Sequence, residues 1–351
     1  MSPEDVLLHP DRGRPLLDVR TPAEFAHGHL VGAQNLPLFT NAERAEVGTL
    51  YKQTSPEAAF LRGLELAGNR MRWYVEEATR LAPDRKVQLH CWRGGQRSSS
   101  LGWLLQQAGF QVDVIEGGYK AVRQAGRDLL SQWPRPLLIL GGPTGAAKTE
   151  VLHLLAQRGE AVVDLEGLAH HKGSSFGALG ESPQPSVEQF ENELFAAFAE
   201  LDEELPRPVW LENESRAIGR VFIPQELWSR MRKSALLILD TPLEWRVDHL
   251  VRVYAQAPKQ ELIDSFERIR KRLGGQHVQR ALAALEVDDF AEAARIALQY
   301  YDKAYAYSVE RSGMPIVDQL APTNPAPAAM AELLAQWLDA HADHPLFTSK
   351  K

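Results

Sequence analysis

Hydrophobic residues in the first third of the chain occur in short runs, and segments with helical spacing separate them. Such runs are typical of buried strands. Strands are predicted at residues 16–20, 31–37, 87–90 and 112–115. Helices are predicted from residue 21, over 56–81 and over 101–107. At the first of these helices, Thr21, Pro22 and Glu24 make a capping box with the favoured first-turn proline. Strands that alternate with helices predict a parallel α/β sheet.

The pattern breaks at residues 131–136, where two prolines bar a continued helix and favour an extended connector. It then restarts with a strand at 137–140, a glycine-bearing turn at 141–148 and a helix at 149–158. Further strands are predicted at 161–164, 209–212 and 235–240, and the chain beyond residue 243 is predominantly helical in pattern. We therefore predict two α/β domains, at 1–130 and 131–351, the second with a helical C-terminal part.

Composition narrows the class of protein. A chain of 351 residues is too long for one small core, and 44% hydrophobic with 24% charged residues is ordinary for a globular protein. No run is long enough for a membrane helix and no secretory signal is evident, so we expect a cytoplasmic protein without a membrane partner. The formal charge of −7 is a mild argument against a nucleic-acid partner.

The chain has one cysteine, which excludes an internal disulfide and a cysteine-rich zinc site. It lies between a strand end and a helix start, where backbone N–H groups and a helix N-terminus favour a thiolate. We predict Cys91 as the catalytic residue. The predicted anion-binding loop comprises Arg93, Gly94, Gly95, Arg97 and Ser98. The alternative is a core cysteine, a common type of buried residue, but two glycines and two arginines would pack poorly against one.

A second phosphate-binding loop follows the strand at 137–140 and opens a helix, the context expected of a Walker A motif. The predicted diphosphate-binding residues are Gly142, Thr144, Gly145, Ala147, Lys148 and Thr149. Lys148 would reach the distal phosphate, and Thr149 could bind Mg²⁺. Ala147 departs from the motif, which has glycine before the lysine. Phosphate binding is predicted, and nucleotide hydrolysis is left open.

Polar residues follow two further strands of the second domain. Because strand C-termini in an open α/β sheet face the ligand crevice, we expect them to form a second part of the site. These candidates are Asp164, Glu166, His170, Ser174, Ser175, Glu212, Glu214 and Arg216. The alternative is a solvated loop. Adjacent histidines at 170–171 make a weak metal site, and no metal is predicted.

Three motifs in the first domain resemble a rhodanese domain over residues 4–128: LLDVRTPAEFAHGHLVGAQNLP, HCWRGGQRS and GFQVDVIEGGYKA. The resemblance implies that Cys91 carries sulfur or selenium, and that Asp18 and Arg20 maintain the fold. Five residues separate Cys91 from Arg97, as in the related dual-specificity phosphatases. A loop of this length suits a phosphate-sized donor such as selenophosphate or thiophosphate.

Nearly the whole chain is similar to the tRNA 2-selenouridine synthase family. The resembling stretches are DLEGLAHHKGSSFG, QFENELF, WLENESRAIGRVFIP and residues 300–305. The resemblance implies that 2-thiouridine at the wobble position of tRNA is S-geranylated by geranyl diphosphate. Selenium from selenophosphate, made by a separate synthase, then replaces the geranylthio group. On this interpretation the P-loop binds the departing diphosphate, and Cys91 carries selenium.

A tRNA partner requires a cationic surface, and residues 228–280 hold eleven Lys/Arg against six Asp/Glu. The candidates for tRNA binding are Arg268, Arg270, Lys271, Arg272, Arg280 and Tyr301. A charge run is more often a solvated helix face, and Tyr301 with Tyr305 has the spacing of helix packing.

Two other functions stay open from the sequence. One is a sulfurtransferase with a small thiol acceptor and a regulatory nucleotide-binding domain. The other is a non-enzymatic phosphate-sensing or tRNA-binding module.

Overall fold

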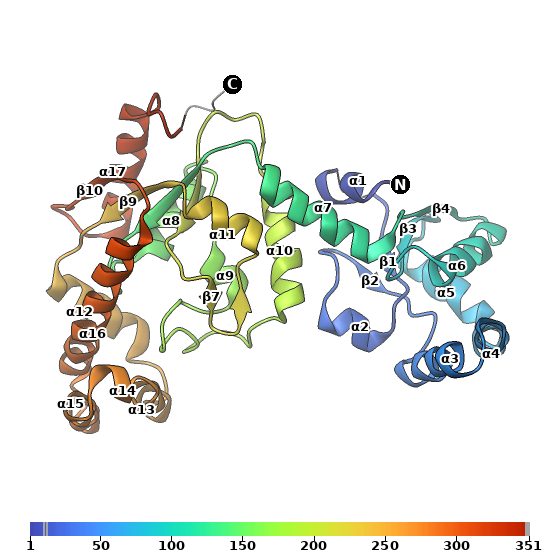
Figure 1. Cartoon of the computed structure of the whole chain (residues 1–351), viewed down its shortest axis with the longest axis horizontal. Helices are drawn as coiled ribbons and strands as arrows, with labels where there is room; N and C mark the ends of the chain where they lie inside the picture. The colour runs from blue at the N-terminus through green and yellow to red at the C-terminus, as the bar shows by residue number, and fades with distance from the viewer. Residues whose placement is uncertain (10, 12, 348–351) are drawn as a thin grey trace. The chain divides into compact units, whose positions relative to one another are not determined.

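The computed structural model describes residues 1–9, 11 and 13–347, which form two compact units (Figure 1). The first unit comprises Met1–Leu130 together with Glu188–Glu200, and the second comprises Ser131–Val187 with the chain from Leu201 onward.

The first unit contains a four-stranded parallel sheet in the order β2-β1-β3-β4. Its strands are β1 (Leu16–Asp18), β2 (Gln34–Asn35), β3 (Lys86–His90) and β4 (Gln111–Val114). Its helices are α1 (Pro3–Leu8), α2 (Pro22–His27), α3 (Asn41–Gln53), α4 (Pro56–Gly68), α5 (Met71–Leu81), α6 (Gln96–Gln107), α7 (Gly118–Gln132) and α10 (Val187–Ala199). Central strand β3 leads directly into the loop that begins with Cys91 (the cysteine loop), so the sheet fixes the position of Cys91.

Local sequence explains how these helices begin and end. The capping box predicted at Thr21 is present, since its hydroxyl accepts from the Glu24 N–H while the Glu24 carboxylate accepts from the Thr21 N–H. The helical pattern over residues 56–81 divides into α4 and α5. The break falls after Gly68, where Asn69 forms the C-cap, because glycine and asparagine are poor helix formers that favour helix ends.

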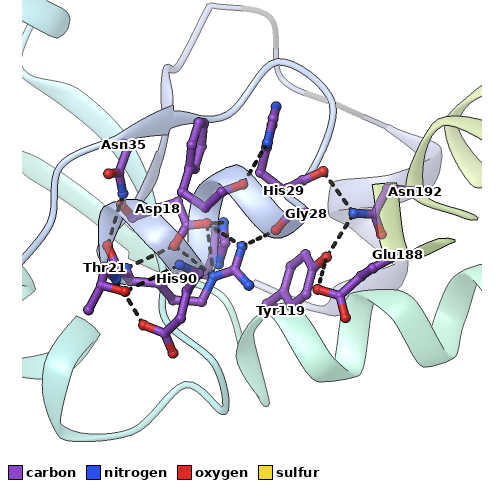
Figure 2. A network of polar contacts seen from close by, with 12 residues as sticks. Asp18, Thr21, Gly28, His29, Asn35, His90, Tyr119, Glu188 and Asn192 are labelled. Atoms are coloured by element: carbon purple, nitrogen blue, oxygen red, sulfur yellow. Dashed lines mark hydrogen bonds and ion pairs between the residues drawn. The ribbon is translucent and has the colours of Figure 1, made fainter. Parts of the chain in front are cut away.

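Helix α10 lies within residues 131–351, the predicted second domain, but it packs in the first unit. The Asn192 side-chain amide donates to the Tyr119 hydroxyl at 2.7 Å and to the His29 carbonyl at 2.9 Å (Figure 2). Gly126 of α7 has no room for a side chain because the ring of Phe195 lies against it. The QFENELF motif therefore supplies one face of the first unit.

The second unit is built on another parallel sheet, in the order β10-β9-β5-β6. Its strands are β5 (Leu137–Gly141), β6 (Val209–Glu212), β9 (Ala235–Leu239) and β10 (Ile316–Leu320), with a hairpin of β7 (Ala217–Ile218) and β8 (Val221–Phe222). Its helices are α8 (Lys148–Gln157), α9 (Leu165–Ala169), α11 (Gln225–Met231), α12 (Leu243–Tyr254), α13 (Lys259–Arg268), α14 (Arg270–Leu273), α15 (Gly275–Glu286), α16 (Phe290–Ser312) and α17 (Pro327–Ala340). Central strand β5 delivers the P-loop at its C-terminal end.

One strand prediction for this unit was wrong. Residues 161–164 form only an isolated bridge, Val162 to Trp210, and the chain turns into α9 directly afterwards with Asp164 as its N-cap. The chain beyond residue 243 is predominantly helical, as predicted, and strand β10 is an exception that the pattern did not indicate. This strand pairs only with β9 at the sheet edge, where polar residues interrupt its apolar pattern and hide it from a search for buried runs.

The core of each unit lies against its own sheet. In the second unit, α8 and α17 pack on one another and on the buried residues of β5 and β9. Within the described residues, none of the helices has both the length and the apolar character needed to span a lipid bilayer.

Candidate functional site

Cys91 lies immediately after β3 and is almost fully buried. Its Sγ accepts a hydrogen bond from the Ser98 hydroxyl at 3.3 Å. Burial alone would raise the pKa of this thiol. The Ser98 hydroxyl and the N–H groups of Ser98, Arg93 and Gly95 outweigh burial and lower the pKa below its ordinary value. The loop therefore favours the nucleophilic thiolate form.

Glycines hold the cysteine loop against the start of α7. Gly94 has φ of +63°, and a Cβ there would lie 2.9 Å from the Gly117 nitrogen. Gly118, with φ of +61°, lies against the Gly94 nitrogen and the Cys91 carbonyl oxygen with no room for a side chain. The Tyr119 N–H then donates to the Cys91 carbonyl at 2.9 Å. The glycine pair after β4 thus fixes the shape of the predicted anion-binding loop.

The two loop arginines have different environments. Arg97 makes an ion pair with Glu24 at 2.7 Å, so α2 orients its guanidinium. Burial of Glu24 is outweighed by hydrogen bonds from Arg97 and the Thr21 N–H, which lower the pKa of that carboxyl. Arg93 is exposed. Both arginines and Cys91 line a cleft of about 1010 Å³, which the outward faces of α3 and α4 border. Arg93 is therefore open to solvent at the cleft, while Arg97 is held in place by Glu24.

Asp18 and Arg20 lie behind this loop and have no exposed side-chain surface. Their ion pair measures 2.6 Å, and Arg20 also donates to the Gly28 carbonyl (Figure 2). The guanidinium stacks over the Tyr119 ring at 3.7 Å. Because this network has no open surface, its geometry fits the interpretation of Asp18 and Arg20 as residues that maintain the fold.

The P-loop adopts a compact anion-binding shape in the second unit. Lys148 Nζ donates to the Gly142 carbonyl at 3.0 Å, so the lysine folds back over the loop. Gly145 has φ of +83°, and a Cβ there would lie 3.2 Å from the Arg246 carbonyl oxygen. Ala147 has φ of +55°, the left-handed conformation that glycine takes without strain. The alanine costs about 1–2 kcal/mol at this position.

An ion pair that the sequence patterns did not predict supports the P-loop. Arg246 of α12 donates to the Thr144 carbonyl at 3.2 Å and pairs with Asp302 of α16 at 2.7 Å. Its side chain is almost fully buried. Asp302 belongs to one of the resembling motifs, but nothing in the sequence links it to an arginine 56 positions earlier. The pair ties helices α12 and α16 to the loop.

Carboxylates lie beside the P-loop helix. The Thr149 hydroxyl donates to Glu166 at 2.7 Å. Asp164 caps α9 by accepting from the Gly167 N–H, and it contacts His153 at 2.6 Å. Oxygen ligands of this type suit Mg²⁺. In the part of the chain that the structure describes, no three His, Cys, Asp or Glu side chains are arranged to hold a metal ion by themselves.

Two glutamates, one at the end of β6 and one just after it, have raised pKa values. Burial, together with Asp164 and Glu166, raises the pKa of Glu212 well above its usual range. Burial and the nearby Glu166 raise the pKa of Glu214 to about 8. The Glu212 carboxyl accepts from the Leu165 N–H at 3.0 Å and so positions the start of α9. At neutral pH the site therefore carries less negative charge than its four carboxyl groups suggest.

The structure brings most of the predicted diphosphate-binding and second-site residues to one cavity of about 940 Å³. They are Gly142, Thr144, Gly145, Ala147, Lys148, Thr149, Asp164, Glu166, Ser174, Glu214 and Arg216. Three predicted residues do not line it. His170 ends α9 and contacts the Pro183 carbonyl, the Ser175 N–H donates to Tyr301, and Glu212 is buried beneath the cavity.

Three further cations line the same cavity: Lys172, Arg232 and Arg311. Lys172 belongs to the DLEGLAHHKGSSFG stretch and makes an ion pair with Glu181 at 2.8 Å. The sequence analysis did not single out the other two. Arg232 follows the last residue of α11 and Arg311 lies on α16, far from the P-loop in sequence. No local motif marks these two arginines, since the fold alone brings them to the P-loop.

The predicted tRNA-binding residues lie on α13–α15 and α16. Arg270 pairs with Glu267 and Arg280 with Glu292, while Arg268 donates to the Ser175 carbonyl. Lys271 and Arg272 are exposed. Tyr301 packs against Tyr300 and Phe176, and its hydroxyl accepts from the Ser175 N–H. This geometry makes Tyr301 a packing residue, while Arg268, Lys271, Arg272 and Arg280 are all exposed.

Comparison with known proteins gives two family matches and a set of full-length relatives. Residues 135–324 match the tRNA 2-selenouridine synthase AAA domain, and residues 2–125 match the rhodanese-like domain. A tRNA 2-selenouridine synthase of Shewanella frigidimarina is 35% identical over 93% of this chain and 95% of its own length. Those of Shewanella loihica and Chromohalobacter salexigens are 36% and 35% identical, over 94% and 89% of this chain and 94% and 91% of their own lengths.

Proposed function

Because the chain belongs to the tRNA 2-selenouridine synthase family, and is therefore a tRNA-modifying enzyme, we propose that it converts wobble 2-thiouridine to 2-selenouridine through S-geranyl-2-thiouridine. Geranyl diphosphate and selenophosphate are the two donors. The observation that carries this proposal is the presence on one chain of a thiol with a lowered pKa and a strand–loop–helix phosphate site.

In the first step, the sulfur of 2-thiouridine attacks the carbon that bears the diphosphate of geranyl diphosphate. A carbon–sulfur bond forms, the carbon–oxygen bond breaks, and diphosphate departs while the base loses its N3 proton. The P-loop amides and Lys148 bind the diphosphate, and Arg232 adds positive charge to the same cavity. Mg²⁺ would be held by Thr149 and Glu166 and would supply further charge on the diphosphate.

In the second step, the Cys91 thiolate attacks the phosphorus of selenophosphate, so that a sulfur–phosphorus bond forms and the phosphorus–selenium bond breaks. The released hydrogen selenide anion attacks C2 of the base, the geranylthio group leaves as geranylthiolate, and water then hydrolyses the phosphocysteine to phosphate and the free thiol. Alkylation in the first step turns a poor leaving group into a good one. The N–H groups and Ser98 that lower the pKa of Cys91 favour the thiolate that makes this attack. Arg93 and Arg97 bind the phosphate portion of the donor at the mouth of the loop.

Mass spectrometry of tRNA nucleosides tests this assignment. Purified protein is incubated with 2-thiouridine-containing tRNA and one donor at a time. Geranyl diphosphate alone should give the geranylated base, and both donors together should give 2-selenouridine. Cys91→Ala should abolish selenation and spare geranylation, whereas Lys148→Ala should impair geranylation.

Ser99→Ala is the control for Cys91→Ala. This exposed serine lies near the start of α6, the helix that follows Cys91. Selenium insertion by Cys91→Ala would refute the role of Cys91. Selenation that consumes ATP would refute the assignment of the P-loop to diphosphate.

A further inference from the structure

The helical part of the second unit contains an apolar cavity of about 60 Å³. Its walls come from α12, α13, α15 and α16 and from the loop after α9. The apolar side chains around it include Leu262, Phe266, Leu285, Phe290, Ala294 and Ala297. None of these groups can hydrogen-bond to a ligand, so the interior of the cavity favours hydrocarbon.

The mouth of this cavity opens at the phosphate-binding loop. Thr144 of the P-loop and Ser174 line both the apolar cavity and the larger phosphate cavity. Leu250, Tyr254 and Tyr301 are also shared between the two. A ligand with its phosphates on the P-loop can therefore extend directly into the apolar space without leaving the second unit.

Aromatic rings shape the passage between the two cavities. Phe176 packs edge-on against Phe266, with ring centroids 5.0 Å apart, and lies 6.4 Å from both Tyr254 and Tyr301. The Tyr301 hydroxyl already accepts from the Ser175 N–H. A purine base would lose the hydrogen bonds that water gives its ring nitrogens and would find few replacements here, whereas an alkyl chain loses none.

The size of the cavity sets how much of a chain it holds. A volume of 60 Å³ corresponds to about four to six water-sized atoms. That is one branched five-carbon unit. The preceding five carbons of a ten-carbon chain would cross the mouth between Thr144 and the tyrosines, and a fifteen-carbon chain would exceed the space.

We propose that this cavity binds the hydrocarbon tail of the diphosphate ester whose head lies on the P-loop, and that its small volume limits the tail to about ten carbons. This inference rests on the proposed function, because it takes geranyl diphosphate to be a substrate. It assigns selection of the tail to α12, α13, α15 and α16, and binding of the head to the P-loop. The alanines at 293, 294 and 297 leave the space that the distal unit fills.

The affinities of a series of diphosphates for the unaltered protein test the role of the cavity. We compare inorganic pyrophosphate, ADP, and the dimethylallyl, geranyl and farnesyl diphosphates. Affinity should rise by about tenfold or more from the five-carbon to the ten-carbon ester, since the added carbons are buried, and should fall at fifteen carbons. ADP should bind no more tightly than pyrophosphate. Equal affinities along the series, or preference for ADP, would overturn the inference.

A substitution that fills the cavity tests the same proposal in a variant. Ala294→Leu places a larger side chain at a partly exposed wall position, and Ala306→Leu does the same on the exposed side of the same helix as a control. Ala294→Leu should raise the KM for geranyl diphosphate about tenfold and leave inhibition by pyrophosphate unchanged. Parallel loss of pyrophosphate binding, or an unchanged KM in a protein that melts normally, would contradict the proposal. Failure of the unaltered enzyme to geranylate tRNA at all would instead reject the proposed function.

Discussion

Opposing effects act on the pKa of the Cys91 thiol. Burial disfavours the thiolate, while one side-chain hydroxyl and three backbone N–H groups favour it. Because the latter prevail, the pKa of Cys91 lies below its ordinary value. Ser98 is the only one of these donors that a substitution can remove without altering the backbone.

We therefore expect Ser98→Ala to raise the pKa of Cys91 and to move its reactivity profile toward higher pH. Below the native pKa both proteins are protonated and slow, and well above the raised pKa both react equally, so the difference is confined to the interval between them. The rate of alkylation by iodoacetamide against pH measures this shift, and the chain has only one cysteine to report it. Ser99→Ala should behave as the unaltered protein. A profile for Ser98→Ala that matches this control would contradict the prediction.

At the scale of elements, the cysteine loop depends on backbone contacts with the start of α7 more than on side chains. Gly94 and Gly118 lie so close that neither can carry a Cβ. Both also have positive φ. Gly117 and Gly118 belong to the GFQVDVIEGGYKA motif, just after the strand predicted at 112–115. Their contact with a loop more than twenty residues earlier required the tertiary fold.

Gly118→Ala should lower the free energy of unfolding by about 2 kcal/mol or more, because it adds a steric clash to backbone strain. Gly32→Ala is the matched control, since Gly32 has φ of +79° but open space around it. Strain alone should cost that variant about 1 kcal/mol. Denaturant unfolding of the two proteins measures the difference. Equal losses of stability would show that the contact with Gly94 contributes nothing.

At the scale of the whole chain, the first unit is not continuous in sequence. Helix α10 packs on α7 through Arg123, Asn192 and Phe195, although the chain enters and leaves this helix from the second unit. Arg123 donates to the Glu188 carbonyl and to Asn192, so the interface contains buried polar groups as well as an aromatic ring. Removal of α10 would leave these groups unsatisfied.

A truncated chain of residues 1–130 should therefore unfold at a lower temperature than the same chain extended by a flexible linker and residues 187–200. The extension restores the partners of Tyr119 and Arg123 and covers Gly126. Thermal unfolding by circular dichroism compares the two. The control carries Asn192→Ala and Phe195→Ala in the linked helix and should lose most of the gain. Equal melting of all three chains would show that α10 does not stabilise the first unit.

Features that depend on neighbouring residues could be read from the order of amino acids alone. Buried runs located the central strands β1, β3, β5 and β9, and the Thr21 capping box fixed where α2 begins. The cysteine loop and the P-loop were recognisable because each is a contiguous segment whose glycines and charges serve one local geometry. The resemblance to one family rested on the same kind of contiguous motif.

Contacts between distant segments could be learned only from the folded chain. The tertiary structure brought Arg246 and Asp302 to the P-loop, moved α10 into the first unit, and placed β10 at the edge of a sheet whose other strands are far more apolar. It also formed the apolar cavity beside Thr144. Each of these depends on packing between elements separated by tens of residues, for which the order of residues along the chain carries no local signal.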